Sequence, residues 1–292
     1  MYSEQGKSAE AESLFKRSLK IDEIALGPEH PTVATTLNNL AILYKGQGKL
    51  DEAEPLLKRS LQITETSLGP AHQSVATSLH NLASLYQDQG QFAEAELLYK
   101  RALKIKESTF GTDHPKVATE LRHLALLYEE QGSQWKAEPI YKRTLQILEK
   151  AVTAKRNLDI QREGLSGDES ELAYSKRCFA RILACQGKTA DAELMMNDAL
   201  NVLRKQPRSS EAKHATDGKA LADIRYDAKR FLEASRLYDL VANAYERAFG
   251  PDDIRVAECQ ESSAKALRKL GREKEAAVRE AEAAAIRKRA EK

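Results

Sequence analysis

Apolar residues in the first half of the chain recur with the spacing of an amphipathic helix. The pattern Leu-x2-Leu-Ala-x2-Tyr occupies residues 37–44 and returns at 79–86 and at 121–128, 42 residues later each time. Spacings of three, four and seven place these side chains on one stripe of a helix. We call the helix that this pattern predicts helix A.

Two kinds of glycine turn separate the predicted helices and alternate every 21 residues. Gln-Gly dipeptides end at Gly6, Gly48, Gly90 and Gly132, and a second glycine, after Leu or Phe, stands at Gly27, Gly69 and Gly111. Glycine can adopt the left-handed conformation that ends a helix, and a proline after it blocks continuation. Two helices and two turns per 42 residues indicate a helical repeat protein.

A second helix, helix B, is predicted after each Gln-Gly turn, as in residues 51–61. Asp51 and Glu54 have the N-cap and N3 spacing of a capping box. Pro55 and Pro139 are expected in the first turn of their helices, where most amide groups have no helical partner.

The period continues into the second half of the chain after one insertion. Gly187 lies 55 residues beyond Gly132, which is one period plus 13 residues, and further steps of 42 fall on Lys229 and Gly271. The extra residues are expected within 153–168, which lacks a clean apolar stripe and ends in turn-like glycines and a serine.

These markers predict a leading helix B at about residues 7–26 and six hairpins after it. We expect a first array over residues 1–152, an insertion over 153–168 and three divergent hairpins over 169–292, continuous with the first array. The last hairpin should end in an alanine-rich, highly charged helix.

Composition narrows the possible partners. With 46 basic and 44 acidic side chains the formal net charge is +2, which argues against a dedicated nucleic-acid binder. No run of 18 apolar residues exists and the first residues lack the features of a signal peptide, so we expect no membrane partner and a cytoplasmic location. Three cysteines fit a reducing compartment.

The helix A pattern, followed by Ala53-x3-Leu57, resembles the tetratricopeptide signature. With the longer period and the motifs Leu-Gly-x2-His-Pro-x-Val-Ala and Leu-Asn-Asn-Leu-Ala-x-Leu-Tyr, it closely resembles the repeats of kinesin light chains. HEAT and armadillo repeats have a similar period, but the Leu-Ala-x2-Tyr spacing disfavours them. The resemblance implies an all-α solenoid, a right-handed superhelix whose concave groove binds short peptides. The resemblance identifies a type of repeat module and does not imply that the chain is a motor subunit.

If helix A lines the groove, the polar positions between its leucines face a ligand. These positions include Asn39, Asn81, Arg122, His123, Arg177 and Arg181. Asparagine can both donate to and accept from a peptide backbone, and the basic residues suit carboxylates. The alternative is that asparagines such as Asn38 and Asn39 only bridge neighbouring helices and that the arginines are solvated.

Other candidate chemistry has simpler explanations. His30, His72 and His114 occur once per repeat, so a shared metal ion is improbable and a local hydrogen bond in each turn is expected. Cys178 and Cys185 are too far apart along one helix to bond to each other. No arrangement of nucleophile and base is evident, so we expect no enzyme activity and no cofactor.

The leading hypothesis is a non-enzymatic scaffold or adaptor that binds an extended, acidic peptide. A second hypothesis is the sensor region of a larger signalling ATPase or enzyme whose catalytic domain is absent from this sequence. A third is a structural array that self-associates through its ends.

Overall fold

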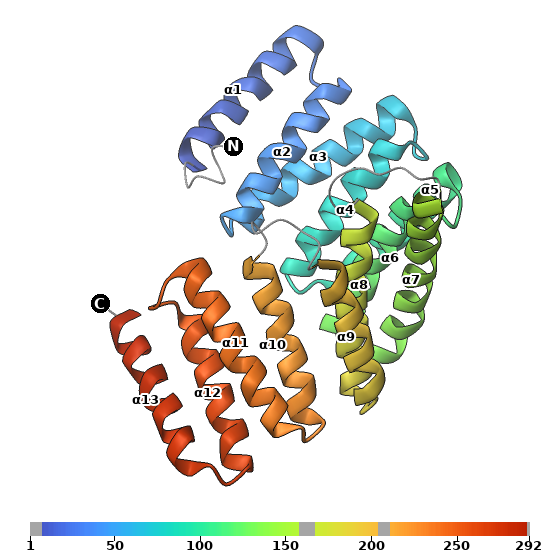
Figure 1. Cartoon of the computed structure of the whole chain (residues 1–292). Coiled ribbons are helices and arrows are strands. Elements are labelled where there is room, and N and C mark those ends of the chain that lie inside the picture. The colour runs from blue at the N-terminus through green and yellow to red at the C-terminus, as the bar shows by residue number, and fades with distance from the viewer. Residues whose placement is uncertain (1–7, 158–166, 204–210, 291–292) are drawn as a thin grey trace. The chain divides into compact units, whose positions relative to one another are not determined.

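The computed structural model describes residues 8–157, 167–203 and 211–290, and all regular structure in these ranges is α-helical. Thirteen helices follow one another in this part of the chain (Figure 1). They are α1 (Ser8–Leu26), α2 (Pro31–Gly46), α3 (Leu50–Leu68), α4 (Gln73–Asp88), α5 (Phe92–Phe110), α6 (Pro115–Glu130), α7 (Gln134–Asn157), α8 (Gly167–Cys185), α9 (Thr189–Leu203), α10 (Glu211–Asp227), α11 (Phe231–Phe249), α12 (Ile254–Lys269) and α13 (Glu273–Ala290).

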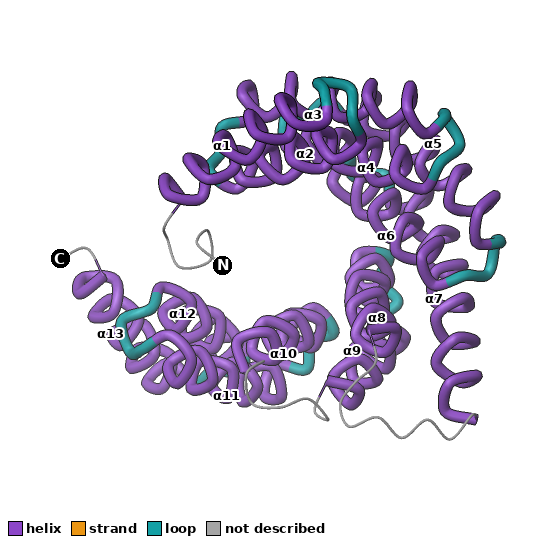
Figure 2. The backbone as a smooth tube through the Cα atoms, turned by 90° about the horizontal axis from the view of Figure 1, so that it is seen from above, coloured by secondary structure: helices purple, strands orange, loops and turns teal. Residues whose placement is uncertain are grey.

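The predicted order of helices is confirmed. Helix α1 is the leading helix B, and α2/α3 to α12/α13 are the six hairpins. The helices divide into two compact units, residues 1–140 and 141–292, which are described separately. In the first unit α2, α4 and α6 form one layer, and α3 and α5 form the other (Figure 2). The all-α fold is confirmed, while the handedness of a superhelix stays a prediction.

The core of each hairpin consists of leucines and small residues on the facing stripes. Leu37 and Ala41 of α2 and Ala53 and Leu57 of α3 are at most 1% exposed. Full burial of a leucine stabilises the fold by about 1.5–3 kcal/mol. The alanines leave little volume between the helices, which lets the backbones approach closely.

Polar contacts join consecutive hairpins of the first unit at one repeated place. A tyrosine of helix A donates to a glutamate 32 residues earlier, on helix B, and a lysine four residues after that glutamate belongs to the same cluster. The three sets, which we call the Glu-Lys-Tyr triads, are Glu12/Lys16/Tyr44, Glu54/Lys58/Tyr86 and Glu96/Lys100/Tyr128, with Tyr Oη to Glu Oε1 distances of 3.1, 3.4 and 2.8 Å. The hydrogen bonds from Lys58, Gln89 and Tyr86 hold the pKa of Glu54 below its usual range.

The turn between helix A and helix B requires one residue with a positive φ. Gly48 has a φ of 74°, and Lys229, which the period places at the same point, has a φ of 60°. Lys229 is the one non-glycine residue with a positive φ in the described ranges. The predicted turn at Lys229 is therefore confirmed, in a conformation that costs a side-chain-bearing residue about 1 kcal/mol.

The periodic histidines cap the N-termini of helices A. Nδ1 of His30, His72 and His114 accepts a hydrogen bond from the backbone N–H two residues later, at 3.1–3.2 Å. Asp253 does the same for α12, where its Oδ1 accepts from Arg255 N at 3.0 Å. The prediction of a local hydrogen bond is confirmed, and its role is to satisfy an amide that the helix leaves unpaired.

Two predictions about helix B were wrong. The N-cap of α3 is Lys49, with no side-chain hydrogen bond, so Asp51 lies inside the first turn and the Asp51–Glu54 capping box does not form. Glu54 instead takes part in its triad. Because the helix begins at Leu50, Pro55 lies in the second turn, where it removes one helical hydrogen bond; Pro139 is likewise inside α7.

The predicted insertion is only partly described. Its first residues continue α7 as far as Asn157, and α8 begins at Gly167, while residues 158–166 lie outside the described ranges. Cys178 and Cys259 are buried and Cys185 is exposed, and none of the three is in a disulfide.

Candidate functional site

A hollow of about 250 Å³ lies between α2, α3 and α4 of the first unit. Its wall includes Asn38 and Asn39 of α2 and Asn81 of α4, so the structure brings the two predicted asparagines to one place. Their shared position follows from the period, since Asn39 and Asn81 are 42 residues apart on consecutive helices A.

The floor of the hollow is built from small hydroxyl side chains that satisfy one another. Ser60 Oγ donates to Ala34 O at 2.8 Å, and Thr64 Oγ1 donates to Ser60 O at 3.0 Å and lies 3.4 Å from Ser78 Oγ. Ser60 and Thr64 therefore use their hydroxyl donors within the fold.

The asparagine amides above this floor have capacity for further hydrogen bonds. Asn39 is exposed and Asn81 half-buried, and within the described ranges neither side chain has a hydrogen-bond partner. Asn38 Oδ1 is buried and also lacks a partner there. A buried carbonyl oxygen without a donor is costly. Asn38, which the sequence also places between the leucines of helix A, lies in the same wall as Asn39 and Asn81.

The two predicted basic residues of α6 have different characters. An Arg122 guanidinium nitrogen lies 3.1 Å from His123 Nε2. Burial, with the charges of His80 and Arg122, lowers the pKa of His123 to about 3. His123 is therefore neutral near pH 7, and of this pair only Arg122 is positively charged.

His123 belongs to an aromatic cluster between α4, α5 and α6. Its ring stands edge-on to His80 at a centroid distance of 4.5 Å and stacks with Tyr99 at 6.1 Å. These contacts fix the ring that Arg122 touches. The place of His123 in peptide binding stays a prediction.

A buried carboxylate beside this cluster was missed by the sequence analysis. Glu120 is fully buried, with Lys106 Nζ 2.6 Å from Oε2 and His80 Nδ1 3.1 Å from Oε1. Burial alone would raise the pKa of Glu120, but the hydrogen bond from His80 and the charge of Lys106 outweigh it and hold this pKa below its usual range.

The period contained a signal for this pair. Thr36, Ser78 and Glu120 are 42 residues apart and all buried, and their partners Asp22, Thr64 and Lys106 are spaced in the same way. Each repeat thus places one polar pair between a helix A and the preceding helix B, and in the third pair both members are charged.

Arg177 and Arg181 lie one turn apart on α8, in the second unit. Arg177 is half-buried, with its guanidinium carbon 4.9 Å from the ring centroid of Tyr174, and Arg181 is exposed. A cation over an aromatic face is held in place without losing its charge.

A family model for the tetratricopeptide repeat matches residues 1–66, 35–108 and 74–150, which together span just over half of the chain. The chain belongs to the tetratricopeptide repeat family. In the described ranges, helices A and B are its two helices per repeat. A comparison with curated proteins gives no match.

Solved tetratricopeptide structures share this fold. One such structure, from Podosopora anserina, is described as kinesin light chain TPR-like repeats that are nearly identical to one another. It is 23% identical to this chain with a TM-score of 0.59, over 75% of this chain and 98% of that one. BtubC (BKLC) of P. vanneervenii is 18% identical with a TM-score of 0.64, over 84% and 91% of the two chains. A signal transduction ATPase (STAND) of Pyrococcus horikoshii with a tetratricopeptide sensor is 14% identical with a TM-score of 0.69, over 96% of this chain and 40% of that one.

The described residues contain neither a membrane-spanning helix nor a metal-binding cluster. They contain no helix with the length and apolar character needed to cross a bilayer. They also contain no group of three histidine, cysteine or acidic side chains placed to hold a metal ion.

Proposed function

We propose that this tetratricopeptide protein is a non-enzymatic interaction module that binds an extended peptide on the helix A face of its first unit. The observation that carries the proposal is the hollow lined by Asn38, Asn39 and Asn81, in which the accessible amides of Asn39 and Asn81 have no hydrogen-bond partner within the described ranges. Asparagine amides can donate to and accept from a peptide backbone, which every sequence offers.

Preference for an acidic peptide is attributed to arginines. Arg122, whose guanidinium contacts neutral His123 on the same helix, suits a carboxylate through charge-assisted hydrogen bonds. Arg177 and Arg181 are a separate candidate contact for acidic side chains on α8.

A peptide-array screen with the intact chain identifies ligands, and variants then test the site. Asn81→Ala should weaken acidic and neutral peptides alike, by about 1 kcal/mol, because a backbone hydrogen bond is lost. Asn243→Ala, an exposed asparagine of α11, is the matched control and should bind as wild type. Equal binding by Asn39→Ala, Asn81→Ala and wild type would rule out this hollow.

Charge reversal tests the acidic preference. Arg122→Glu with Arg181→Glu should weaken acidic peptides by roughly 2 kcal/mol and leave neutral peptides unchanged. Raised salt should reproduce part of the loss. Unchanged affinity with an intact helical signal would exclude these arginines.

A second candidate function is the sensor region of a larger signalling ATPase. Its support is the likeness to the Pyrococcus horikoshii protein, which spans nearly all of this chain but less than half of that one. The sequence of the complete gene separates the two functions, because a nucleotide-binding domain encoded in the same reading frame would favour the sensor.

A further inference from the structure

The junction of α11, α12 and α13 departs from the Glu-Lys-Tyr triads of the first unit. In each triad the glutamate and the tyrosine are 32 residues apart. The residues with this separation at the last junction are Ser235 and Leu267, and Asp239 occupies the position of the lysine. Two large hydrogen-bonded side chains are thus replaced by smaller ones.

A hollow of about 380 Å³ occupies this junction. Ser235 and Leu267 both line it, so it lies where the glutamate and tyrosine of a triad would meet. Its apolar wall also includes Leu232 and Val278, which are 38% and 56% exposed. Exposed large apolar side chains beside a hollow are stabilised when a partner covers them.

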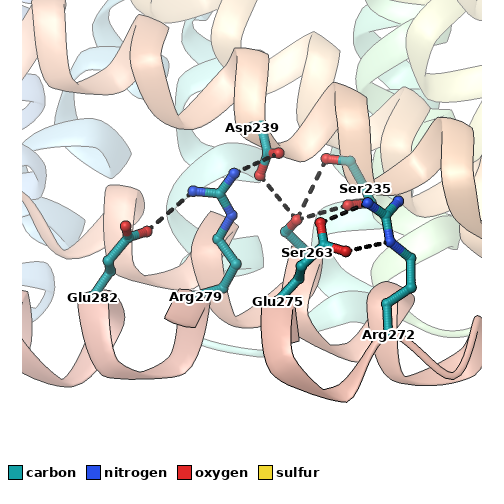
Figure 3. A network of polar contacts seen from close by, with 7 residues as sticks. All are labelled: Ser235, Asp239, Ser263, Arg272, Glu275, Arg279 and Glu282. Atoms are coloured by element: carbon teal, nitrogen blue, oxygen red, sulfur yellow. Dashed lines mark hydrogen bonds and ion pairs between the residues drawn. The ribbon is translucent and has the colours of Figure 1, made fainter. Parts of the chain in front are cut away.

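The polar side of the hollow is internally satisfied around Ser235 and Asp239. Ser235 Oγ lies 3.0 Å from Ser263 Oγ, and Ser263 Oγ donates to Asp239 Oδ1 at 2.9 Å (Figure 3). Arg279 Nη2 donates to Asp239 Oδ2 at 2.9 Å, on the opposite carboxylate oxygen. These bonds hold the wall in one arrangement.

Three arginines line the hollow, and two of them are neutralised. Arg272 donates twice to Glu275, at 2.6 and 2.5 Å, and Arg279 pairs with Asp239 and with Glu282 (Figure 3). Arg236 is exposed and makes no hydrogen bond or ion pair within the described ranges. Among the three arginines of the hollow, Arg236 is thus the one without a hydrogen-bonded or ion-paired acid, and it stands beside an apolar wall. Its charge acts on Glu233, three residues earlier on α11, at longer range.

We propose that this hollow docks a segment of a partner protein that inserts an aromatic side chain and places an adjacent carboxylate on Arg236. The shape argument is that the space lies where a tyrosine ring packs in each triad of the first unit. The charge argument is that the carboxylate meets the arginine of the hollow that has no hydrogen-bonded or ion-paired acid. This site is lined by α11 and α13, with Leu267 of α12, and is distinct from the asparagine hollow of the first unit.

The probe is a fluorescein-labelled peptide, Gly-Ser-Asp-Phe-Asp-Glu-Ser-Gly, whose binding to the full chain is followed by fluorescence anisotropy. Two matched probes replace its phenylalanine by alanine, or its three acidic residues by their amides. We expect each matched probe to bind at least about tenfold more weakly, since it lacks either the apolar or the charged contact.

Two variants of the chain test the same contacts from the other side. Arg236→Glu should weaken the acidic probe by at least about tenfold. Leu267→Tyr with Ser235→Glu restores the tyrosine and the glutamate of a triad, with Asp239 still at the lysine position. It should fill the hollow and weaken binding of the probe while the helical signal is kept. Arg247→Glu reverses a charge about three turns further along α11 and should leave binding unchanged.

Three results would overturn the proposal. Arg236→Glu and the filling variant could both bind the probe as wild type does, or the alanine probe could bind as tightly as the phenylalanine probe. Light scattering could instead reveal a concentration-dependent dimer that Arg236→Glu abolishes, which would make a second copy the occupant. Asn81→Ala should not change binding of the probe here, so failure of this site and failure of the asparagine hollow can be told apart.

Discussion

In the first unit, helices A begin at histidines and turn into helix B at glycines. In the second unit, Asp253 caps α12 and Lys229 takes the place of a glycine. The backbone is the same at both places, because a helix start needs an acceptor for its free amide and the turn needs a positive φ. The comparison teaches that the period fixes what each position must do, while the residue that does it can change.

The largest expected effect concerns the buried ion pair of the first unit. Lys106→Met leaves Glu120 buried without its cation and should cost about 3 kcal/mol in the free energy of unfolding, measured by urea denaturation. In the second unit Ser263→Ala removes only hydroxyl hydrogen bonds and should cost about 1 kcal/mol.

A double variant sharpens this comparison. Lys106→Thr with Glu120→Ser reproduces the Thr64–Ser78 pair of the preceding junction, so it should recover most of the loss. If the double variant is as unstable as Lys106→Met, the ion pair itself stabilises this junction. The loss in Lys106→Met would then not come from leaving Glu120 buried without its cation.

The second prediction concerns the pH dependence that His123 gives to the first unit. Its folded pKa of about 3 lies below the ordinary value of 6.5, so the unfolded chain binds this proton more readily. Its contribution to stability is complete above pH 6.5 and is lost as pH falls toward 3. His123→Phe should reduce the slope of unfolding free energy between pH 6 and 4 by about 1.4 kcal/mol per pH unit. An unchanged slope would contradict the burial of a neutral imidazole.

The third prediction tests a close helix contact in the second unit. A Cβ on Gly218 of α10 would lie 2.7 Å from Val241 Cγ2 of α11. Gly218→Ala should therefore cost about 1–3 kcal/mol, although alanine is the better helix former. Val241→Ala in the same chain should return part of that loss, and thermal denaturation followed by circular dichroism measures both.

The smallest expected effect is a gain. Lys229→Gly should raise the free energy of unfolding by about 0.5–1 kcal/mol, because the residue already has a positive φ. Gly90→Lys makes the reverse change in the first unit, where a Cβ meets no atom within 4 Å, and should cost a similar amount. The change in the free energy of unfolding should be positive for Lys229→Gly and negative for Gly90→Lys. Changes of the same sign would mean that backbone conformation is not the cause.

Sequence periodicity predicted the fold because every junction repeats the same geometry. It placed the turn at Lys229 from spacing alone, and it placed Asn39 and Asn81 on one face. It misplaced the start of α3, because the N-cap there is Lys49 with no side-chain hydrogen bond, whereas the sequence favoured Asp51.

The parts of the candidate sites that were missed depend on pairs of residues far apart in the sequence. Lys106, the partner of Glu120, is on another helix, and the second-unit hollow lies where Ser235 and Leu267 both replace larger residues of a triad. A pattern along one helix contains neither fact. Comparing residues 14 or 32 apart across repeats would have shown both.

The Glu-Lys-Tyr triads also affect how the chain can fold during its synthesis. Each one closes when a tyrosine 32 residues after its glutamate becomes available, so a growing chain completes one junction before it starts the next. Such short-range closure favours fast folding in order of synthesis. We expect a ribosome-bound chain that has exposed Tyr44 to resist proteases between α1 and α2, long before the last helix exists.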